Sequence, residues 1–425
     1  MKVLLLGSGG REHALAWKIA SSPLCDALFI APGNPGTADC GQNVDLDILD
    51  FPAIHQFCLD EKIQVLLVGP EEPLVRGITG FLRRQPDLKD LIICGPDAVG
   101  AQLEGSKAYA KAFMAESGIP TARYGEFNRD QVDEAIAFLD TFTPPYVIKA
   151  DGLAAGKGVI ICQEKEEAIQ SIRGMFDGEF GSAGHTVVLE EFLAGIEFSV
   201  FALTDGKHAC ILPVAKDYKR IGEGDTGPNT GGMGAVSPVP FIDQQMMEKV
   251  MQRIVAPTIS GLTRRQIDYQ GFIFFGLIAV EGEPMVIEYN CRMGDPETEV
   301  VMPRLSTDLL QMLVAMHERK LDTITVEMDP RTAVTVMLVS GGYPGSYPKG
   351  LPVLGTDGTP PDHTWLFHAG TRQIGDQLVT NGGRVLACTG MGSDLREAQS
   401  RAYALAGKIC FDHVNFRRDI GRDLE

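Results

Sequence analysis

Short apolar runs alternate with helical stretches over the first hundred residues. The runs VLLLG, ALFIAPG, VLLVGP and LIICGP lie at residues 3–7, 27–33, 65–70 and 91–96. Each run ends in a glycine-containing loop, followed by a segment with the apolar spacing of a helix. This alternation predicts a parallel sheet wound with helices. Ligands of such sheets bind beyond the carboxyl ends of the strands, where the loops at 7–12, 31–36 and 69–73 would gather.

The pattern changes after residue 104. Residues 106–120 predict an amphipathic helix that ends at a glycine and a proline. Two predicted strand pairs follow, in PPYVIKADGLAAGKGVIIC and in TVVLEEFLAGIEFSVFAL. Residues 218–238 consist almost entirely of turn-forming residues, and they predict a long loop. A helical stretch at 243–263 then precedes a strand pair, GFIFFGLIAV and PMVIEYNCR, around a turn at 281–283.

The last hundred residues form a third predicted unit, from 326 to 425. Strands are expected near 333–339 and 384–389, and a helix near 394–411. The Asn-Gly dipeptide in TNGGRVL indicates a hairpin turn. This unit shows no catalytic constellation, so we interpret it as a structural cap.

Composition narrows the function classes. The formal charge of −18 argues against broad nucleic-acid binding but allows small phosphorylated ligands. No apolar run is long enough to span a membrane, and the N-terminal apolar run is read as a first strand. Nine cysteines without a Cys-x-x-Cys pair, and eight histidines without metal-ligand spacing, predict a reduced, cytoplasmic enzyme without zinc.

The first glycine loop, GSGGRE, only partly fits a dinucleotide fingerprint. Gly7 and Gly9 match it, but Glu12 stands where the third glycine belongs. The second strand also lacks the terminal acid that would bind a ribose hydroxyl. A helix N-terminus still favours an anion, and Arg11 adds a positive charge. The loop is therefore either a phosphate site or a purely structural turn.

Lysines and acids mark a possible nucleotide site in the middle of the chain. Lys149 ends a strand and precedes a loop with glycines at 152, 156 and 158, which would let backbone N–H groups approach a polyphosphate. A flexible surface hairpin explains the same loop. Glu190 and Glu197 flank a strand connection that could meet adenine and ribose, or they are simply exposed glutamates.

The stretch IEYNCRMGDPETE, residues 287–299, carries the most specific pattern. Alternate residues of a strand face the same side, so Glu288, Asn290 and Arg292 would lie in a row. The opposite face, expected to be the core face, carries Ile287, Tyr289 and Cys291. A carboxylate, an amide oxygen and a guanidinium together suit an oxygen-ligated divalent cation beside a phosphate.

These motifs resemble those of the ATP-grasp ligases, and most closely those of the phosphoribosylamine–glycine ligase family. The similar segments are GSGGREHAL, KADGLAAGKGV, GDTGPNTGGMGA and RMGDPETE. The resemblance runs from residue 5 to beyond 300 and is weaker over the C-terminal unit. It implies an ATP-dependent ligase of purine synthesis that joins glycine to phosphoribosylamine through a glycyl phosphate. Magnesium, or else manganese, would be the metal.

The resemblance also implies a fold of α/β and α+β domains. Residues 1–104 would form a Rossmann-like, substrate-binding parallel-sheet domain, and 105–325 an ATP-grasp domain with a lid over about 122–190. Residues 326–425 would form a small α+β domain. The chain is expected to act as a monomer on small-molecule substrates alone, without nucleic acid or membrane.

Residue roles carry over by motif. The implied ATP-binding residues are Lys107, Lys149, Gly152, Gly156, Gly158, Glu190, Phe192, Leu193, Glu197, Lys219 and Asn229. The implied metal ligands are Glu288 and Asn290. The implied substrate-binding residues are Gly9, Gly10, Arg11, Glu12, Asn34, Glu71, Asp295 and Glu297. Arg292 would steady the transferring phosphoryl group, and Asp295 would orient the reacting groups as a catalytic residue.

Three positions depart from the family pattern. Met293 replaces a more usual Leu or Phe, a change that conserves volume. Lys216 and Tyr218, in AKDYKR, replace a more usual Gln and His, so the contacts of that segment are open. Three alternative functions also stay open: an ATP-grasp ligase for a different carboxylate, a nicotinamide-dependent oxidoreductase, and a catalytically silent nucleotide-binding regulator.

Overall fold

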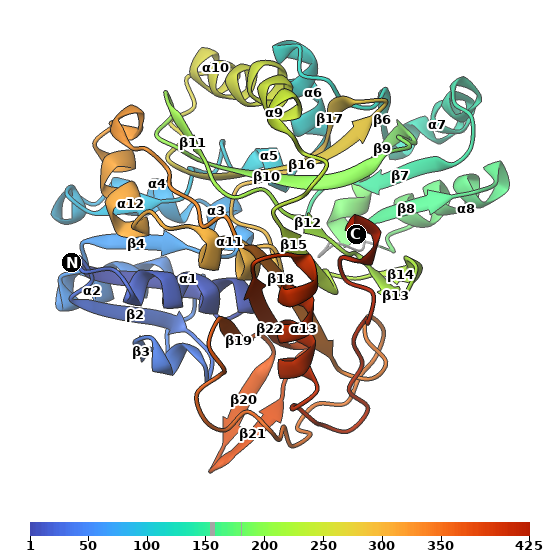
Figure 1. Cartoon of the computed structure of the whole chain (residues 1–425). Helices are drawn as coiled ribbons and strands as arrows, with labels where there is room; N and C mark the ends of the chain where they lie inside the picture. Colours follow the sequence, from blue (N-terminus) through green and yellow to red (C-terminus); the bar gives the residue numbers. More distant parts are fainter. Residues whose placement is uncertain (154–157, 180) are drawn as a thin grey trace.

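A computed structural model describes residues 1–153, 158–179 and 181–425. Its first sheet has five parallel strands in the order β3-β2-β1-β4-β5 (Figure 1, blue). The strands are β1 (Lys2–Gly7), β2 (Ala27–Pro32), β3 (Gln42–Asn43), β4 (Val65–Val68) and β5 (Ile92–Cys94). The helices are α1 (Gly10–Ala20), α2 (Phe51–Glu61), α3 (Glu71–Val75), α4 (Ile78–Arg83) and α5 (Gln102–Gly105). The predicted parallel sheet is confirmed.

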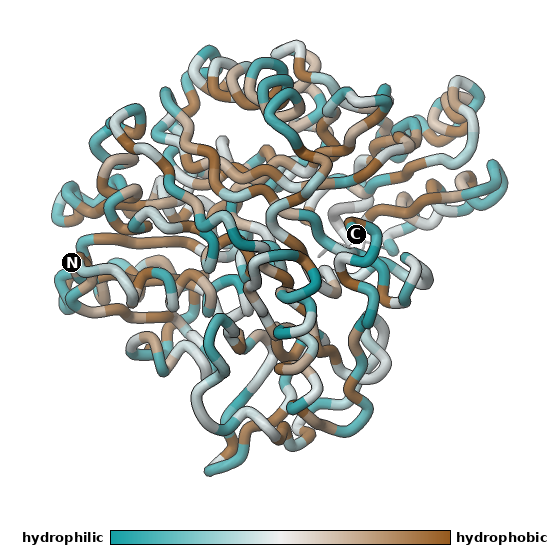
Figure 2. The backbone as a smooth tube through the Cα atoms, in the orientation of Figure 1, coloured by the Kyte–Doolittle hydropathy of each residue, from teal (hydrophilic) through white to brown (hydrophobic). Residues whose placement is uncertain are grey.

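The apolar runs are continuous because both faces of this sheet are covered. Leu4 and Leu6 of β1 belong to one buried cluster, whereas Val3 and Leu5 belong to another on the opposite face. Strands buried on both faces lose the alternation of polar and apolar residues. In Figure 2, brown apolar segments accordingly follow the strands through the interior.

Two antiparallel sheets make up the middle of the chain. The central sheet has the order β11-β10-β16-β17, and an outer sheet has the order β6-β9-β7-β8. The central strands are β10 (Ile196–Thr204), β11 (Ala209–Ile211), β16 (Gly271–Val280) and β17 (Glu283–Asn290). The outer strands are β6 (Tyr124–Asn128), β7 (Tyr146–Ala150), β8 (Val159–Cys162) and β9 (Thr186–Glu191). In Figure 1 the outer sheet, with its helices α7 (Val132–Phe138) and α8 (Lys165–Phe176), projects to the right.

The predicted helices of this region are confirmed. Helix α6 (Lys107–Ser117) ends where Gly118 adopts a left-handed conformation, with φ of 66°. The stretch predicted at 243–263 contains α9 (Gln244–Val250), a π-helical turn (Met251–Val255) and α10 (Ala256–Arg264). These helices cover the central sheet. Phe275 and Tyr289 of that sheet are therefore buried.

The alternation predicted for 287–292 needs one correction. Tyr289 and Cys291 are buried as expected, but Ile287 is only half-buried. The register between β16 and β17 shifts at this point, so that Leu277 faces Val286 while Gly276 faces Glu288. This bulge places Val286 in the core in place of Ile287.

A third sheet corrects one further expectation. Its order is β12-β15-β18-β22-β19, so it combines strands from both sides of residue 326. The strands are β12 (Lys216–Asp217), β15 (Gly234–Ser237), β18 (Thr332–Val339), β19 (Thr364–His368) and β22 (Arg384–Gly392). The predicted loop at 218–238 thus contains the buried strand β15, together with the ribbon β13 (Arg220–Gly222) and β14 (Thr226–Asn229). The domain boundaries stay a prediction.

The Asn-Gly hairpin prediction is wrong. Strand β21 (Gln377–Thr380), which precedes Asn381, pairs with β20 (Thr371–Ile374), whereas β22, which follows it, pairs with β18 and β19. The backbone N–H of Asn381 instead donates to the Gly370 carbonyl at 2.7 Å. Helices α11 (Thr298–Arg304), α12 (Leu309–His317) and α13 (Leu395–Ala406) complete the structure; α13 confirms the helix expected near 394–411.

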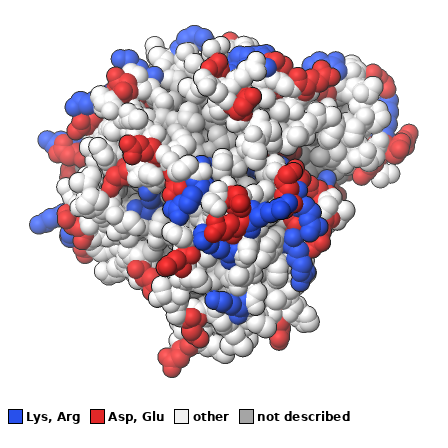
Figure 3. All heavy atoms as spheres, in the orientation of Figure 1, with Lys and Arg blue, Asp and Glu red and all other residues white. Residues whose placement is uncertain are grey.

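The surface carries charges of both signs close together. On the face in Figure 3, Lys and Arg side chains alternate with Asp and Glu across the middle of the molecule. No helix among the described residues is long and apolar enough to cross a membrane.

Candidate active site

A buried carboxylate between two lysines joins the outer sheet to helix α6. Glu190 of β9 receives an ion pair from Lys149 of β7 at 2.8 Å and another from Lys111 of α6 at 2.9 Å. Burial alone would raise the pKa of Glu190, but the two lysines lower it. Lys149 also donates to the Ile287 carbonyl at 3.4 Å, which links the outer sheet to β17.

Two further lysines lie near Glu288 of β17. Lys107 Nζ donates to the Gly152 carbonyl at 2.9 Å. Burial lowers the pKa of Lys107, although the negative charge of Glu288 acts in the opposite direction. Lys219 pairs with Glu197 at 2.7 Å. Burial would lower the pKa of Lys219, but Glu197, Asp217 and Glu288 together raise it well above its usual value. Lys107 and Lys219 therefore both lie within electrostatic reach of Glu288.

Arg292 and Asn290 share an acidic neighbour at the end of β17. Arg292 Nη2 lies 2.7 Å from Glu104 Oε1, and Arg292 Nε lies 3.4 Å from Glu71 Oε2. The Asn290 amide is best satisfied when its nitrogen donates to Glu104 Oε1 at 2.9 Å and to the Tyr289 carbonyl at 3.2 Å. In that orientation its amide oxygen is the atom available for a further ligand.

The glycine loop after β1 holds an anion of its own. Glu12 Oε2 accepts from the Gly9 N–H at 2.7 Å, so a carboxylate already lies at the N-terminus of α1. The other oxygen of Glu12 accepts from Arg11 Nε at 2.5 Å, and Arg11 also donates to the Met293 carbonyl at 3.3 Å. The charge of buried Arg11 is therefore already compensated within the loop.

Acidic residues of the turn at 294–299 face one another beneath this loop. Asp295 pairs with Arg384 of β22 at 3.1 Å. Burial, and secondarily Asp217, raises the pKa of Glu297 to about 7. Glu299 is fully buried, and neither carboxylate oxygen has a hydrogen-bond partner among the described residues. Burial, and secondarily Asp295, raises the pKa of Glu299 well above its usual value.

The remaining predicted residues lie around these groups. Gly10 contacts the acidic turn, because a Cβ on it would lie 2.4 Å from Glu299 Oε1. Phe192 is exposed and Leu193 half-buried in the connection after β9, while Asn229 ends β14. Gly158 lies just before β8, and Gly156 lies outside the described residues. Asn34 is buried, with its carboxamide bonded to backbone groups at 8, 36, 37 and 368.

The two departures at Lys216 and Tyr218 contact the end of the chain. Lys216 Nζ lies 3.1 Å from Asp423 and 3.8 Å from the centre of the Tyr218 ring. Tyr218 donates to Asp423 at 2.5 Å. Asp217, between them, lies instead in the electrostatic environment of Lys219, Glu197 and Glu288. Lys216 and Tyr218 therefore both help to hold the C-terminal segment.

Four residues of the site had no prediction: Lys111, Glu104, Asp217 and Arg384. Lys111 lies one helical turn after Lys107, so its position on the same face of α6 was a usable signal. The sequence carried no signal for Arg384, because the turn at 294–299 is almost ninety residues away along the chain. Interpreting the C-terminal unit only as a structural cap does not account for this ion pair.

Cys291 is predicted to be unreactive in the native protein. It is 2% exposed, and burial raises its pKa well above the usual value of a thiol. Since the thiolate is the reactive form, a thiol reagent should label exposed Cys410 at least tenfold faster than Cys291. Mass mapping of labelled peptides over time measures both rates, and equal rates would contradict this prediction.

Family models match almost the whole chain. The N, ATP-grasp and C domain models of phosphoribosylglycinamide synthetase match residues 1–104, 105–298 and 333–423. Phosphoribosylamine–glycine ligases of Vibrio cholerae and Escherichia coli K12 are 47% and 48% identical to the chain. Both alignments cover 99% of this chain and 98% of the relative.

Solved structures agree in fold. Phosphoribosylamine–glycine ligase from Thermotoga maritima superposes with a TM-score of 0.84 at 37% identity, over 99% of this chain and 100% of that one. A biotin carboxylase domain from Hydrogenobacter thermophilus, solved with MgADP, gives 0.72 at 16% identity over 97% and 91%, which shows the fold alone. With family models over all three parts and near-half identity over the full length, the chain belongs to the phosphoribosylamine–glycine ligase (phosphoribosylglycinamide synthetase) family.

Proposed function

We propose that the chain joins glycine to 5-phosphoribosylamine, using ATP and Mg²⁺, to give glycinamide ribonucleotide, ADP and phosphate. The observation that carries this proposal is Glu288 next to Asn290 on β17, within electrostatic reach of Lys107 and Lys219. Oxygen ligands beside lysines suit a nucleotide polyphosphate with its metal.

The metal site would be completed by the nucleotide. Among the described residues, no group of three or more His, Cys, Asp or Glu side chains could hold a metal by themselves. Glu288 and the free amide oxygen of Asn290 supply two hard oxygen ligands, and phosphate oxygens and water would supply the others. Such a site fits Mg²⁺, with Mn²⁺ as a substitute. The bound metal would neutralise charge on the transferring phosphoryl group.

The protein side chains would position two substrates for attack. Lys107, Lys149 and Lys219 would hold the phosphates, and Arg292 would steady the phosphoryl group as it moves to the glycine carboxylate. The acyl phosphate makes that carboxyl carbon a better electrophile, and the neutral amine then displaces phosphate. Asp295 and Glu297 would orient the ammonium of glycine and the incoming amine.

The three parts of the chain would divide these tasks. Residues 105–325 would bind ATP, with the outer sheet over about 122–190 closing as a lid that keeps water from the acyl phosphate. Residues 1–104 would form one wall of the amine site. The chain would act as a monomer. Nine free cysteines support a reducing, cytoplasmic compartment.

Nucleotide turnover, measured with each component omitted in turn, tests this proposal. We expect ADP and phosphate to accumulate only when Mg²⁺, glycine and freshly generated phosphoribosylamine are all present. ADP formation that requires another carboxylate would retain an ATP-grasp ligase and reject glycine. Release of AMP would indicate adenylate chemistry and contradict the roles of Arg292 and Glu288.

A further inference from the structure

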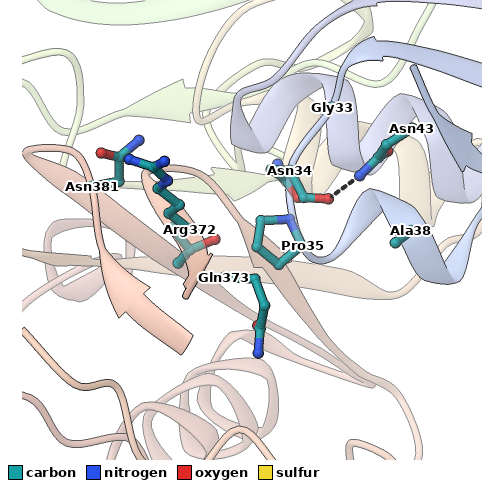
Figure 4. A pocket seen from close by; sticks show the side chains of 9 residues that line it. Gly33, Asn34, Pro35, Ala38, Asn43, Arg372, Gln373 and Asn381 are labelled. Atoms are coloured by element: carbon teal, nitrogen blue, oxygen red, sulfur yellow. Dashed lines mark hydrogen bonds between the residues drawn. The ribbon is translucent and has the colours of Figure 1, made fainter. Parts of the chain in front are cut away.

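A pocket of about 540 Å³ opens between the N-terminal unit and the hairpin β20–β21. This volume lies in the range of small-molecule sites, about 300–1,000 Å³. The loop after β2 forms one wall with Gly33, Asn34 and Pro35, and the hairpin and the residue that follows it form the other with Arg372 and Asn381. Figure 4 shows Arg372 and Asn381 next to each other, across from Asn34 and Pro35.

The charge of this pocket suits an anion. Of the nine lining residues, all within the described chain, Arg372 is the one charged residue, and the others are amides, a threonine, glycine, alanine and proline. Arg372 and Asn381 are both exposed. No carboxylate of the described residues lies within ion-pair distance of Arg372, unlike Arg384 of the same unit, which pairs with Asp295. The guanidinium is therefore free to bind two oxygens of a phosphate.

The other anion site considered for this substrate is already occupied. Glu12 accepts the Gly9 N–H at the N-terminus of α1, and it also pairs with Arg11. A dianionic phosphate placed there would meet the Glu12 carboxylate. Electrostatic repulsion therefore disfavours the glycine loop and favours Arg372 as the phosphate contact.

Short contacts connect the pocket to the acidic turn. Asn34 Nδ2 donates both to the Ser8 carbonyl and to the His368 carbonyl, each at 2.8 Å. The backbone N–H of His368 donates to His13 Nδ1 of α1, also at 2.8 Å. A Cβ on Gly9, next to Ser8, would lie 3.5 Å from Asp295 Oδ2. These bonds fix the hairpin side of the pocket to the loop that borders the reacting groups.

We infer that this pocket binds the phosphate of the ribose phosphate substrate through Arg372 and Asn381. The phosphate would lie on the C-terminal hairpin while the amine points past Ser8 and Gly9 toward Asp295. This inference rests on the proposed function for the identity of the sugar phosphate. It also gives the C-terminal unit a direct part in substrate binding.

Calorimetry on the full chain, with ribose 5-phosphate as a stable probe, tests the pocket with and without a non-hydrolysable ATP analogue and Mg²⁺. We expect Arg372→Gln to weaken binding by about 10–100-fold and Asn381→Ala by several-fold. Arg84→Gln is the matched control, because Arg84 is also exposed but lies outside the pocket. Its affinity should stay within twofold of the parent chain, and melting curves verify that each variant folds.

Kinetics separate this inference from the proposed function. In Arg372→Gln we expect the KM for phosphoribosylamine to rise by the same factor, with the KM values for ATP and glycine unchanged. If the parent chain ligates but this KM does not move, the inference is wrong and the proposed function stands. If ribose 5-phosphate binds through Arg372 without any ligation, the proposed function is wrong instead. Undetectable binding, or equal affinity for inorganic phosphate, also overturns the sugar phosphate assignment.

Discussion

Glu288→Gln is expected to lower kcat at saturating ATP by about 10³-fold, the scale of losing one charge-stabilising contact in a transition state. The amide keeps the shape of the side chain but removes the negative charge that would hold the metal. Glu288 lies on β17 within reach of Lys107 and Lys219, so the nucleotide phosphates would lose their metal between the lysines. Steady-state turnover over a range of Mg²⁺ concentrations measures this loss.

The matched control is Glu126→Gln, an exposed strand carboxylate on β6. It should retain the parent kcat and the parent Mg²⁺ dependence. Mn²⁺ should restore part of the activity of Glu288→Gln, since it also binds oxygen ligands and adopts the same octahedral coordination as Mg²⁺. If the kcat of Glu288→Gln stays within threefold of the parent value, Glu288 is not a metal ligand.

Glu297→Gln is expected to make the free protein more stable above pH 7 and to remove most of its activity. Burial and Asp217 raise the pKa of Glu297 to about 7, so the native state binds more protons than the unfolded state between about pH 4.5 and 7. The free energy of unfolding therefore falls as pH rises through this window and stays reduced above it. The reduction is about 3 kcal/mol.

The amide removes this penalty, because it has no charge to bury. At pH 8 we expect Tm to rise by about 2–4 °C over the parent chain, and the difference to disappear below about pH 4.5. The same change removes a carboxylate proposed to hold the ammonium of glycine, so kcat/KM for glycine should fall by about 100-fold. Thermal melting across pH, with Glu126→Gln as control, measures the first effect. A lower Tm at pH 8 would contradict the interpretation.

Local sequence patterns predicted the elements whose environment is uniform. The continuous apolar runs identified the strands of the parallel sheet, because both faces of β1 are buried along its length. Alternation along β17 correctly placed Glu288 and Asn290 on the open face, since Tyr289 and Cys291 are buried. The bulge at Val286 and Ile287 escaped prediction because it depends on the register with β16.

The prediction of a loop at 218–238 was wrong for a related reason. Its glycines and prolines indicated a loop, but Gly234–Ser237 pairs with β18 and is buried by a sheet formed mainly by the last hundred residues. The Asn-Gly dipeptide at 381–382 lies between two strands, but it carried no information on which strands those two pair with. Partner strands are a property of the whole fold.

Residue types and order along the chain were enough to identify an ATP-grasp ligase and to nominate charged residues for its site, because each motif needs only its neighbours to be recognised. The sequence does not show which charged side chains pair with one another. Glu190 between Lys111 and Lys149, Arg384 against Asp295, and the pocket between Asn34 and Arg372 join residues from distant parts of the chain. Burial and distance set these pairings and the pKa of Glu297, and both exist only once the chain has folded.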